Sequence, residues 1–448
     1  MPDEPRNAEH IFGQVVDAAR SHGVADVEAI VSGDEHALTR FANNEIHQNV
    51  AERTRHLSVR AVIDGRTARA STNRLDRNGI REVVEQAVAI TRLTESDSEL
   101  VPLAARAPYE CPSRFFQATA VATPEERARG VAEAIAVVSN TGQTAAGIYS
   151  TGLSTFSLLN SNGVCASYAE TMARFSITAM AADSSGWAKE SACYHGDLDP
   201  VLVAHRAARK AERSRAPRVA PPGLYTVVLE PAAVLDLVGQ MFGDFSGTAI
   251  RDGRSFLNDR LSKKIFGENI TIHDDSLNPL QTGAPFDGEG VPRKRLTLVD
   301  RGVVQDIAYC RQTAASAGVE PTGHGFPLPN EFGEAPANIV IAGGDSSVEE
   351  MVRSTERGIL VTRLWYIREV DPYEKIFTGM TRDGTFLIEG GAVTAGIRNF
   401  RFNQSLIELL SNVEALSAPV RASGEESIDM VVPAMKVHGF RFTEVTRF

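Results

Sequence analysis

Hydrophobic and polar positions follow two different periods along the first 200 residues. Apolar residues recur every third or fourth position, as on one face of a helix, in residues 8–22, 80–88 and 124–138. Other segments have the strand-like patterns that predict β-structure: 27–32, 36–41, 57–63, 67–71, 145–150, 155–160, 164–168 and 172–181. Helices mixed with strands that short turns join predict an α+β fold.

Local turn and cap signals support these assignments. Asp64-Gly65 and Asn162-Gly163 are dipeptides typical of two-residue hairpin turns. The run Thr123-Pro124-Glu125-Glu126 predicts a helix start, because Thr123 can cap the helix, Pro124 suits its first turn and Glu126 completes a capping box. The segment from 94 to 122, with several prolines, is expected to be irregular.

A proline-rich stretch divides the chain. Residues 213–223, RSRAPRVAPPG, contain three prolines in a polar context, which is typical of a linker. We therefore expect two domains with mixed or antiparallel sheets and packed helices. Residues 1–215 form the N-terminal α+β domain, and residues 223–448 form a sheet-rich C-terminal domain.

The C-terminal half is organised around residues 270–317. Residues 295–299 and 303–309 flank the turn Asp300-Arg301-Gly302, which predicts a hairpin. Further strands are expected at 224–229, 339–342, 358–366 and 385–389, and helices at 231–242, 347–353 and 404–413. A loop rich in Gly and Pro is expected at 318–338.

Charge and composition exclude some classes of function. The net charge of −11 and the isoelectric point of about 5.5 argue against non-specific electrostatic binding to nucleic acid or to anionic membranes. The densest basic runs, 206–210 and 293–295, are interpreted as solvated faces. The four cysteines form no CxxC pair, the N-terminus shows no export signal, and no apolar stretch reaches about 18 residues. A reduced cytoplasmic protein is expected.

Four segments resemble a known family. They are RFANNEIHQN at 40–49, FLNDRLSKKIFGENITIHDD at 256–275, FDGEGVP at 286–292 and LVDRGVVQDIAYCRQTA at 298–314. They resemble the TldD/PmbA family, bacterial proteins once called modulators of DNA gyrase, and the resemblance runs from about residue 40 to 445. It implies a two-domain α+β architecture and two branches that pair. The TldD-like branch carries zinc on a His-Glu-x-x-x-His helix plus a cysteine near the C-terminus, and the TldE/PmbA-like branch lacks this site.

The zinc motif is absent from this sequence. None of the ten histidines is followed by Glu, and no two lie four residues apart. The resemblance aligns the metal helix with residues 234–245, where Gly239, Gln240 and Asp244 stand in place of His, Glu and His. It aligns the cysteine with residues 425–427, which contain no Cys. The C-terminal domain is thus interpreted as a degenerate metalloprotease-like domain with no catalytic, cofactor-binding or metal residues, and zinc is expected only in a partner.

Several carboxylates are alternative candidates. His273-Asp274-Asp275 offers three metal-capable side chains, but polarity at a strand end is the favoured interpretation. Asp287 and Glu289 resemble an acid–base pair. Within a glycine-rich turn they are expected to hold backbone N–H groups instead.

Two further side chains have a chemical and a structural interpretation. His324 could face a substrate, and a solvated loop position is favoured. Cys310, next to Tyr309 and Arg311, could be a nucleophile, and a small buried apolar group on the second strand of the hairpin is favoured. No base that would activate the thiol is evident in the sequence.

The resemblance and the missing motif together predict a TldE/PmbA-like subunit without activity of its own. Its partner would be a TldD-like zinc metalloprotease, in a complex that cleaves unfolded or extended peptides, including leader peptides. Strand addition would let such a complex bind extended chains with little regard to sequence. A homodimer stays open. The alternatives are a self-sufficient metallopeptidase or hydrolase with an unrecognised site, and a DNA gyrase-binding modulator.

Overall fold

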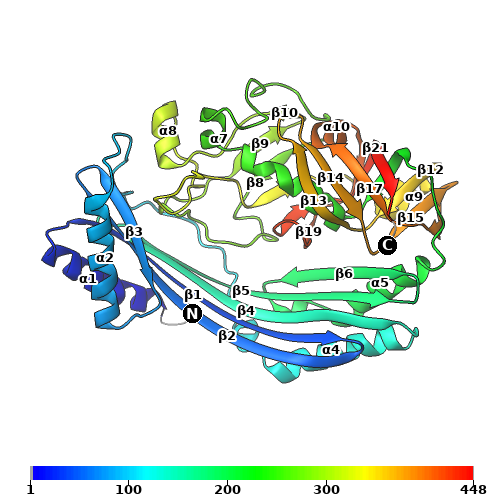
Figure 1. Ribbon diagram of the computed structural model, residues 1–448, viewed down its shortest axis with the longest axis horizontal. Coiled ribbons are helices and arrows are strands. Elements are labelled where there is room, and N and C mark those ends of the chain that lie inside the picture. Colours follow the sequence, from blue (N-terminus) through cyan, green and yellow to red (C-terminus); the bar gives the residue numbers. More distant parts are fainter. Residues whose placement is uncertain (1–3, 447–448) are drawn as a thin grey trace.

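The computed structural model describes residues 4–446, and within them six long strands form one antiparallel sheet in the order β3-β2-β1-β4-β5-β6 (Figure 1). The strands are β1 Asp26–Ala42, β2 Glu45–Ile63, β3 Arg66–Thr72, β4 Thr144–Asn160, β5 Cys165–Met180 and β6 Ser185–Ala192. The sequence predicted segments 27–32 and 36–41 as two strands, and this was wrong. They form a single strand because β1 pairs with β2 and β4 without a break through the polar residues between them.

Four helices cover one face of this sheet. They are α1 Glu4–Ser21, α2 Arg77–Leu93, α4 Pro124–Ser139 and α5 Pro200–Arg213. Helices α1 and α2 pack mainly against β1 to β3. Helix α4 packs against β1, β2 and β4, and α5 packs against β5 and β6. The short α3, Gln117–Ala120, lies in the irregular segment before α4.

The predicted helix start at Thr123 is confirmed. The amide of Glu126 donates to Thr123 Oγ1 at 3.2 Å, and the amide of Thr123 donates to Glu126 Oε2 at 2.8 Å. The two bonds satisfy orphan N–H groups of the first turn of α4.

The other face of the long sheet receives the C-terminal half of the chain. Ile30 of β1 and Leu158 of β4 point away from the helices and pack with Phe286. Polar contacts add to this junction, since the Arg114 guanidinium donates to three carbonyls of the C-terminal half, those of Ser276, Asn278 and Gly283.

The C-terminal half contains two more sheets among the described residues. One has the order β10-β9-β8-β11-β20-β19, and the nine-stranded other has the order β13-β14-β17-β21-β7-β12-β15-β16, with β18 beside β21. The strands of the first are β8 Ile272–Asp274, β9 Leu296–Asp300, β10 Val303–Val304, β11 Ile339–Ile341, β19 Val420–Ala422 and β20 Met430–Val432. Those of the second are β7 Gly223–Leu229, β12 Arg357–Val361, β13 Leu364–Asp371, β14 Ile376–Thr381, β15 Thr385–Glu389, β16 Ala392–Gly396, β17 Phe400–Ser405, β18 Val413–Leu416 and β21 Met435–Val445.

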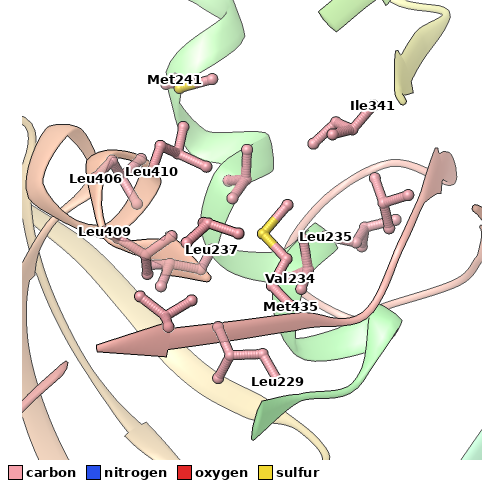
Figure 2. Packing of buried hydrophobic residues seen from close by; sticks show 14 of the residues in the cluster. Leu229, Val234, Leu235, Leu237, Met241, Ile341, Leu406, Leu409, Leu410 and Met435 are labelled. Atoms are coloured by element: carbon pink, nitrogen blue, oxygen red, sulfur yellow. The ribbon is translucent and has the colours of Figure 1, made fainter. Parts of the chain in front are cut away.

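Helix α6, Pro231–Val238, lies in the core of this half. Its apolar residues form one cluster with both sheets and with α10, Leu406–Ser411. The leucines of α10 lie on one side of α6 and Ile341 of β11 lies on the other (Figure 2). The remaining helices are α7 Gly247–Arg251, α8 Arg311–Ala317 and α9 Val348–Arg353, and two 3₁₀ turns span His195–Asp197 and Gly239–Asp244.

The predicted hairpin exists but is shorter than expected. Its turn at Arg301-Gly302 has positive φ at both residues, as a tight hairpin turn requires, and β10 ends at Val304. After β10 the chain leaves the sheet, because Ala308 exchanges backbone hydrogen bonds with Phe245 and Gly247. The placement of Cys310 on a hairpin strand was therefore wrong, and Cys310 is the N-cap of α8.

The mixture of helices and largely antiparallel sheets confirms the α+β class. The chain passes from α5 to β7 through residues 214–222, within the predicted linker, and the two-domain boundary there stays a prediction. Within residues 4–446, none of the helices has the length and hydropathy that a membrane span requires.

Candidate functional site

The segment aligned with the metal helix begins as an α-helix and ends as a 3₁₀ turn. Pro231 occupies the first turn of α6, where its missing N–H costs nothing. The helix is buried on all sides from Ala233 onwards and ends at Val238. Gly239 to Asp244 then form the tighter turn, so the spacing from 239 to 244 differs from that of a regular helix.

Gly239 lies directly against Ser427. A Cβ atom built on Gly239 would overlap the Ser427 hydroxyl and lie 2.7 Å from its Cβ, closer than real Cβ atoms approach. The resemblance aligns residues 425–427 with the cysteine ligand, which implies that this region lies next to the helix aligned with the metal helix. The structure has the two regions next to each other. The two positions are already in contact, and no side chain at 239 fits without displacing Ser427.

Gln240 is committed to backbone carbonyls. Its amide nitrogen donates to Asp236 O at 3.1 Å and to Glu426 O at 3.0 Å. A side-chain amide has no basic group at neutral pH, so Gln240 cannot replace the general base of a metallopeptidase. It joins the end of α6 to the 424–429 segment.

Asp244 forms an ion pair with an ammonium group of the chain itself, which it shares with Glu369. Lys375 Nζ lies 2.5 Å from Asp244 Oδ2 and 2.6 Å from Glu369 Oε1, with only 4% of the Lys375 side chain exposed. Burial raises the pKa of Asp244, and the hydrogen bond and charge of Lys375 act in the opposite direction. A cation thus already stands beside this carboxylate.

Residues 424–429, the closing segment, are held over the end of α6 by Asp236. Asp236 Oδ1 accepts the amides of Glu425 and Glu426 at 3.0 and 2.9 Å. Its Oδ2 is buried without a hydrogen-bond partner in the described part of the chain, and burial raises the pKa of Asp236 to about 6.

The closing segment is also tied to both neighbouring structures. The Glu426 carboxylate accepts the amides of Tyr366 and Ile367 of β13 at 2.9 and 3.3 Å. On the other side, Lys189 Nζ of β6 donates to Gly424 O at 2.6 Å and lies 3.3 Å from Glu425 Oε1. These contacts close the position where the resemblance places a metal.

The residues at this position do not fit zinc. Glycine has no ligating side chain, the Gln240 amide is engaged with carbonyls, and Asp244 already pairs with Lys375. Elsewhere in residues 4–446, no group of three or more His, Cys, Asp or Glu side chains is placed to hold a metal ion.

A second polar region is buried beneath the 318–338 loop. His324 Nε2 lies 3.0 Å from Asp274 Oδ1, and neither side chain is exposed. The solvated position expected for His324 was wrong, because the loop folds over β8 and buries the ring. Asp274 Oδ2 also accepts the amides of Ala337 and Asn338 at 2.6 and 2.7 Å, so strand-end polarity does not describe it.

The three residues of the His273-Asp274-Asp275 run are not brought together as ligands. His273 is half-buried, and Asp275 lies 3.4 Å from Arg295 on the outside. Burial by itself raises the pKa of Asp274, but the contact with His324, the charge of Arg293 and the Asn338 amide together outweigh burial and hold the pKa below the usual range.

Asp287 and Glu289 hold backbone N–H groups, as predicted. Asp287 accepts the amides of Glu289, Val291 and Gly325 at 2.8 to 2.9 Å. Glu289 Oε2 accepts the amide of Arg311 at 2.8 Å, whereas Oε1 is buried without a partner among the described residues. Burial and the neighbouring Asp287 raise the pKa of Glu289 to about 7.

Glu334 is the residue that sequence reasoning missed. Its buried carboxylate accepts the Ser246 hydroxyl, the Thr248 amide, the Cys310 amide and the Thr313 hydroxyl at 2.7 to 3.0 Å. No local pattern marks it, because it is one glutamate in a loop and its donors lie 21 to 88 positions away. Burial and Glu334 raise the pKa of Cys310 to about 12, so the thiol stays protonated and is no nucleophile.

Thr322, His324 and Asp274 form a chain that resembles a hydrolase triad. Thr322 Oγ1 lies 2.9 Å from His324 Nδ1, and His324 Nε2 reaches Asp274. The Thr322 hydroxyl is buried and engages both the amide and the carbonyl of Tyr309, at 2.8 and 3.1 Å. It is therefore a structural hydroxyl with no free approach for a substrate carbonyl.

The chain matches three family models in order. PmbA/TldA metallopeptidase domain 1 matches residues 27–91, the central domain matches 118–215 and the C-terminal domain matches 222–444. The chain belongs to the PmbA/TldD metallopeptidase family, which confirms the resemblance found in the sequence.

Curated relatives are named metalloproteases. A metalloprotease of Methanothermobacter thermautotrophicus is 27% identical over 290 residues, 60% of this chain and 61% of that protein. Metalloprotease PmbA of Escherichia coli O157:H7 is 23% identical over 404 residues, 86% of this chain and 85% of that protein. The chain spans about half to three fifths of the length of the first curated relatives it matches.

Solved structures share the fold. TldE from Thermococcus kodakarensis superposes with a TM-score of 0.87 at 20% identity, covering 97% of this chain and 100% of that one. A Thermotoga maritima protein described as a modulator of a DNA gyrase gives a TM-score of 0.86 at 20% identity, with the same coverage. At this identity the likeness shows the fold alone.

Proposed function

We propose that this chain is the non-catalytic, TldE/PmbA-like subunit of a TldD-type zinc metalloprotease complex that cleaves unfolded or extended peptides. The observation that carries the proposal is the contact between Gly239 and Ser427, the positions that the resemblance aligns with a histidine ligand and with the cysteine region. The names of the curated relatives support the reaction class of the complex. Zinc would be supplied by a TldD-like partner in the cytoplasm.

The chemistry of peptide hydrolysis supports a division of labour. A zinc peptidase needs neutral imidazole or carboxylate ligands, an open position for water and a nearby base. At the aligned position this chain offers a glycine, an amide that holds the closing segment, and an aspartate paired with Lys375. The Gln240 amide and the Asp244–Lys375 pair stabilise the fold at the position where an active subunit would bind the metal.

Edge strands support a role in peptide binding. In the part of the chain that the structure describes, β6 pairs on one side only, with β5, and β13 pairs only with β14. An extended peptide can add to a free strand edge through main-chain hydrogen bonds. Each edge is partly occupied, β13 at Tyr366 and Ile367 by Glu426 and β6 at the Trp187 carbonyl by Lys210, whose Nζ donates to it at 3.3 Å. The β6 edge is the one that lies at the domain junction beside Lys189.

Reconstitution tests this proposal. The purified chain, a TldD-like protein from the same cell and zinc are incubated with an unfolded peptide, separately and together. Cleavage is expected only when both proteins are present, it should stop on chelation, and the two proteins should co-purify.

Two outcomes would favour the other candidates. Cleavage by this chain alone, retained after chelation, would identify a self-sufficient hydrolase. Recovery of gyrase without any TldD-like protein in a pull-down would identify a gyrase-binding modulator.

A further inference from the structure

The junction between the long sheet and the C-terminal half contains an open hollow of about 520 Å³, lined by more basic than acidic side chains. Arg174 of β5 and Lys189 of β6 line it from the sheet, and Arg293 lines it from the opposite wall. We propose that this hollow, the junction pocket, binds a carboxylate of an extended peptide. The proposal deepens the proposed function and rests on it for the identity of the ligand as a peptide.

The guanidinium of Arg293 has an N–H group that makes no hydrogen bond within residues 4–446. Its Nε donates to Ala284 O at 3.2 Å, whereas Nη1 is buried and has no hydrogen-bond partner within residues 4–446. A buried donor without a partner is destabilising, and a charged one more so, so a ligand oxygen or water is expected there. A carboxylate offers the geometry that a guanidinium fork prefers.

Arg174 is only weakly engaged. It lies 3.6 Å from Asp429 Oδ2, and 48% of its side chain is exposed. Asp429 already pairs with Arg421 at 2.8 Å and accepts the Ser191 hydroxyl at 2.9 Å. Arg421 is therefore the main partner of Asp429, and the half-exposed Arg174 guanidinium, which lies further from Asp429, can also contact a ligand anion.

The acidic residues of the pocket do not cancel its charge. Its lining contains the cations Arg174, Lys189 and Arg293 and the carboxylates Glu425 and Asp429. Lys189 forms an ion pair with Glu425, and Arg421, which does not line the pocket, forms one with Asp429. Arg174 also lies near Asp429, and Arg293 acts on the buried carboxylates Asp274 and Asp287 behind the wall. The remaining excess of positive charge suits one carboxylate and is too small for a polyanion.

The position of the pocket connects it to the degenerate site. Ser427, which contacts Gly239, also lines the pocket, and so does Glu425 of the closing segment. Lys189, which lines the pocket, belongs to β6, the edge strand nearest the C-terminal half (Figure 1). A peptide whose carboxylate sits in the pocket would thus begin beside the edge to which its backbone could add.

Two kinds of carboxylate share this chemistry, the C-terminus of a peptide and an Asp or Glu side chain. Three fluorescein-labelled probes separate them: Gly-Ala-Ala-Ala with a free C-terminus, the same peptide as its amide, and Gly-Ala-Ala-Glu amide. Binding to the purified chain is followed by fluorescence anisotropy at low salt. The acid that fits is expected to bind about tenfold more tightly than the neutral amide.

The overall charge of the chain makes this test stringent. A net charge of −11 repels acidic peptides, so a preference for the acid over the amide requires a local cationic site. Arg174→Gln is expected to weaken binding of the acid about fivefold and leave the amide unchanged, and Arg174→Lys should keep most of the affinity. Arg129→Gln is the matched control, because Arg129 is an exposed arginine of α4 on the helix-covered face of the sheet.

Equal binding of acid and amide, or an equal loss in Arg174→Gln and Arg129→Gln, would overturn the proposal. The experiment needs neither zinc nor a partner protein. Failure to pair with a TldD-like protein would therefore leave this result standing, and failure to bind carboxylates would leave the pairing standing.

Discussion

Two regions bury polar groups: the degenerate metal position, and the second polar region beneath the 318–338 loop, called the cluster below. They differ in how the hydrogen-bonding capacity of the buried groups is satisfied. In the cluster, carboxylates collect several N–H and O–H donors each, as Glu334 and Asp287 do. At the degenerate position a close glycine contact, an amide bridge and one ion pair close the space. A carboxylate is retained in a core where backbone donors surround it. The position that we propose has lost its metal is filled by packing.

The cluster should therefore be the more sensitive of the two regions. Glu334→Ala removes one carboxylate and strands four donors, two of them backbone amides that cannot move away. The free energy of unfolding is expected to fall by on the order of 4 kcal/mol, as measured by urea denaturation. Glu331→Ala, an exposed glutamate of the same loop, should change it by less than about 0.5 kcal/mol.

If Glu334→Ala does not fold, Glu334→Gln keeps an acceptor oxygen and should fold with reduced stability. Equal stability of Glu334→Ala and Glu331→Ala would show that the cluster is not what holds the loop.

Glu289 makes the cluster sensitive to pH. An unfolded glutamate loses its proton near its ordinary pKa of 4.5, whereas folded Glu289 loses it at about 7. Between these values the native state holds one proton more than the unfolded state, so stability falls as pH rises through this window. The loss is at most about 3 kcal/mol and is complete above the folded pKa.

Glu289→Gln should remove that slope, because an amide does not titrate while its oxygen can still accept the Arg311 amide. Urea denaturation of the parent and the variant at pH 5 and pH 8 measures the difference. The variant should gain relative to the parent at pH 8, and parallel pH profiles would place the Glu289 carboxylate in contact with water.

At the degenerate position the expected effect is smaller and lies in packing. Gly239→Ala inserts a methyl group against Ser427, which should cost about 1–3 kcal/mol. Ser427→Gly in the same chain should recover most of that loss, since it removes the overlapping side chain. Gly243→Ala, in the same 3₁₀ turn, is the control, because a Cβ there meets nothing within 4 Å among the described residues.

A double-mutant cycle on thermal unfolding gives the coupling between positions 239 and 427. Additive effects would contradict the contact and weaken the inference that Ser427 fills a former ligand position.

Local features of both regions could be predicted from the sequence, and long-range ones could not. The capping box at Thr123 and the two-residue turn at Asp64-Gly65 depend on neighbouring residues, so their patterns were sufficient. The burial of His324 depends on Asp274, 50 positions earlier, and Glu334 depends on donors in two other segments, 246–248 and 310–313. No short-range pattern encodes such pairings.

The degenerate position was located by resemblance alone. Gly239 and Ser427 are 188 positions apart, and neither residue type suggests a site. Lys375 could not be predicted beside Asp244, because a lysine in a turn between two strands is ordinarily solvated. The resemblance indicated which residues stand at the ligand positions, and the structure shows which contacts those residues make.

The smallest effect is expected from restoring the ligands themselves. The triple variant Gly239→His, Gln240→Glu and Asp244→His should bind zinc weakly and cleave no peptide when isolated. An imidazole at 239 would displace Ser427, and Lys375 would place an ammonium beside the ligand at 244 and repel the metal. Two imidazoles also lack a third protein ligand, since residues 425–427 contain no cysteine.

Partners that orient the ligands are missing as well, and their loss typically costs about 10- to 100-fold in affinity or activity. Zinc content after dialysis, and cleavage of an unfolded peptide with and without chelator, measure both outcomes. Lys375→Met added to the triple variant should raise zinc binding more than it raises cleavage, because it removes the competing charge but supplies no base or third ligand. Zinc-dependent cleavage by the triple variant alone would mean that the site was nearly intact, and the contrast between a filled site and a retained cluster would fail.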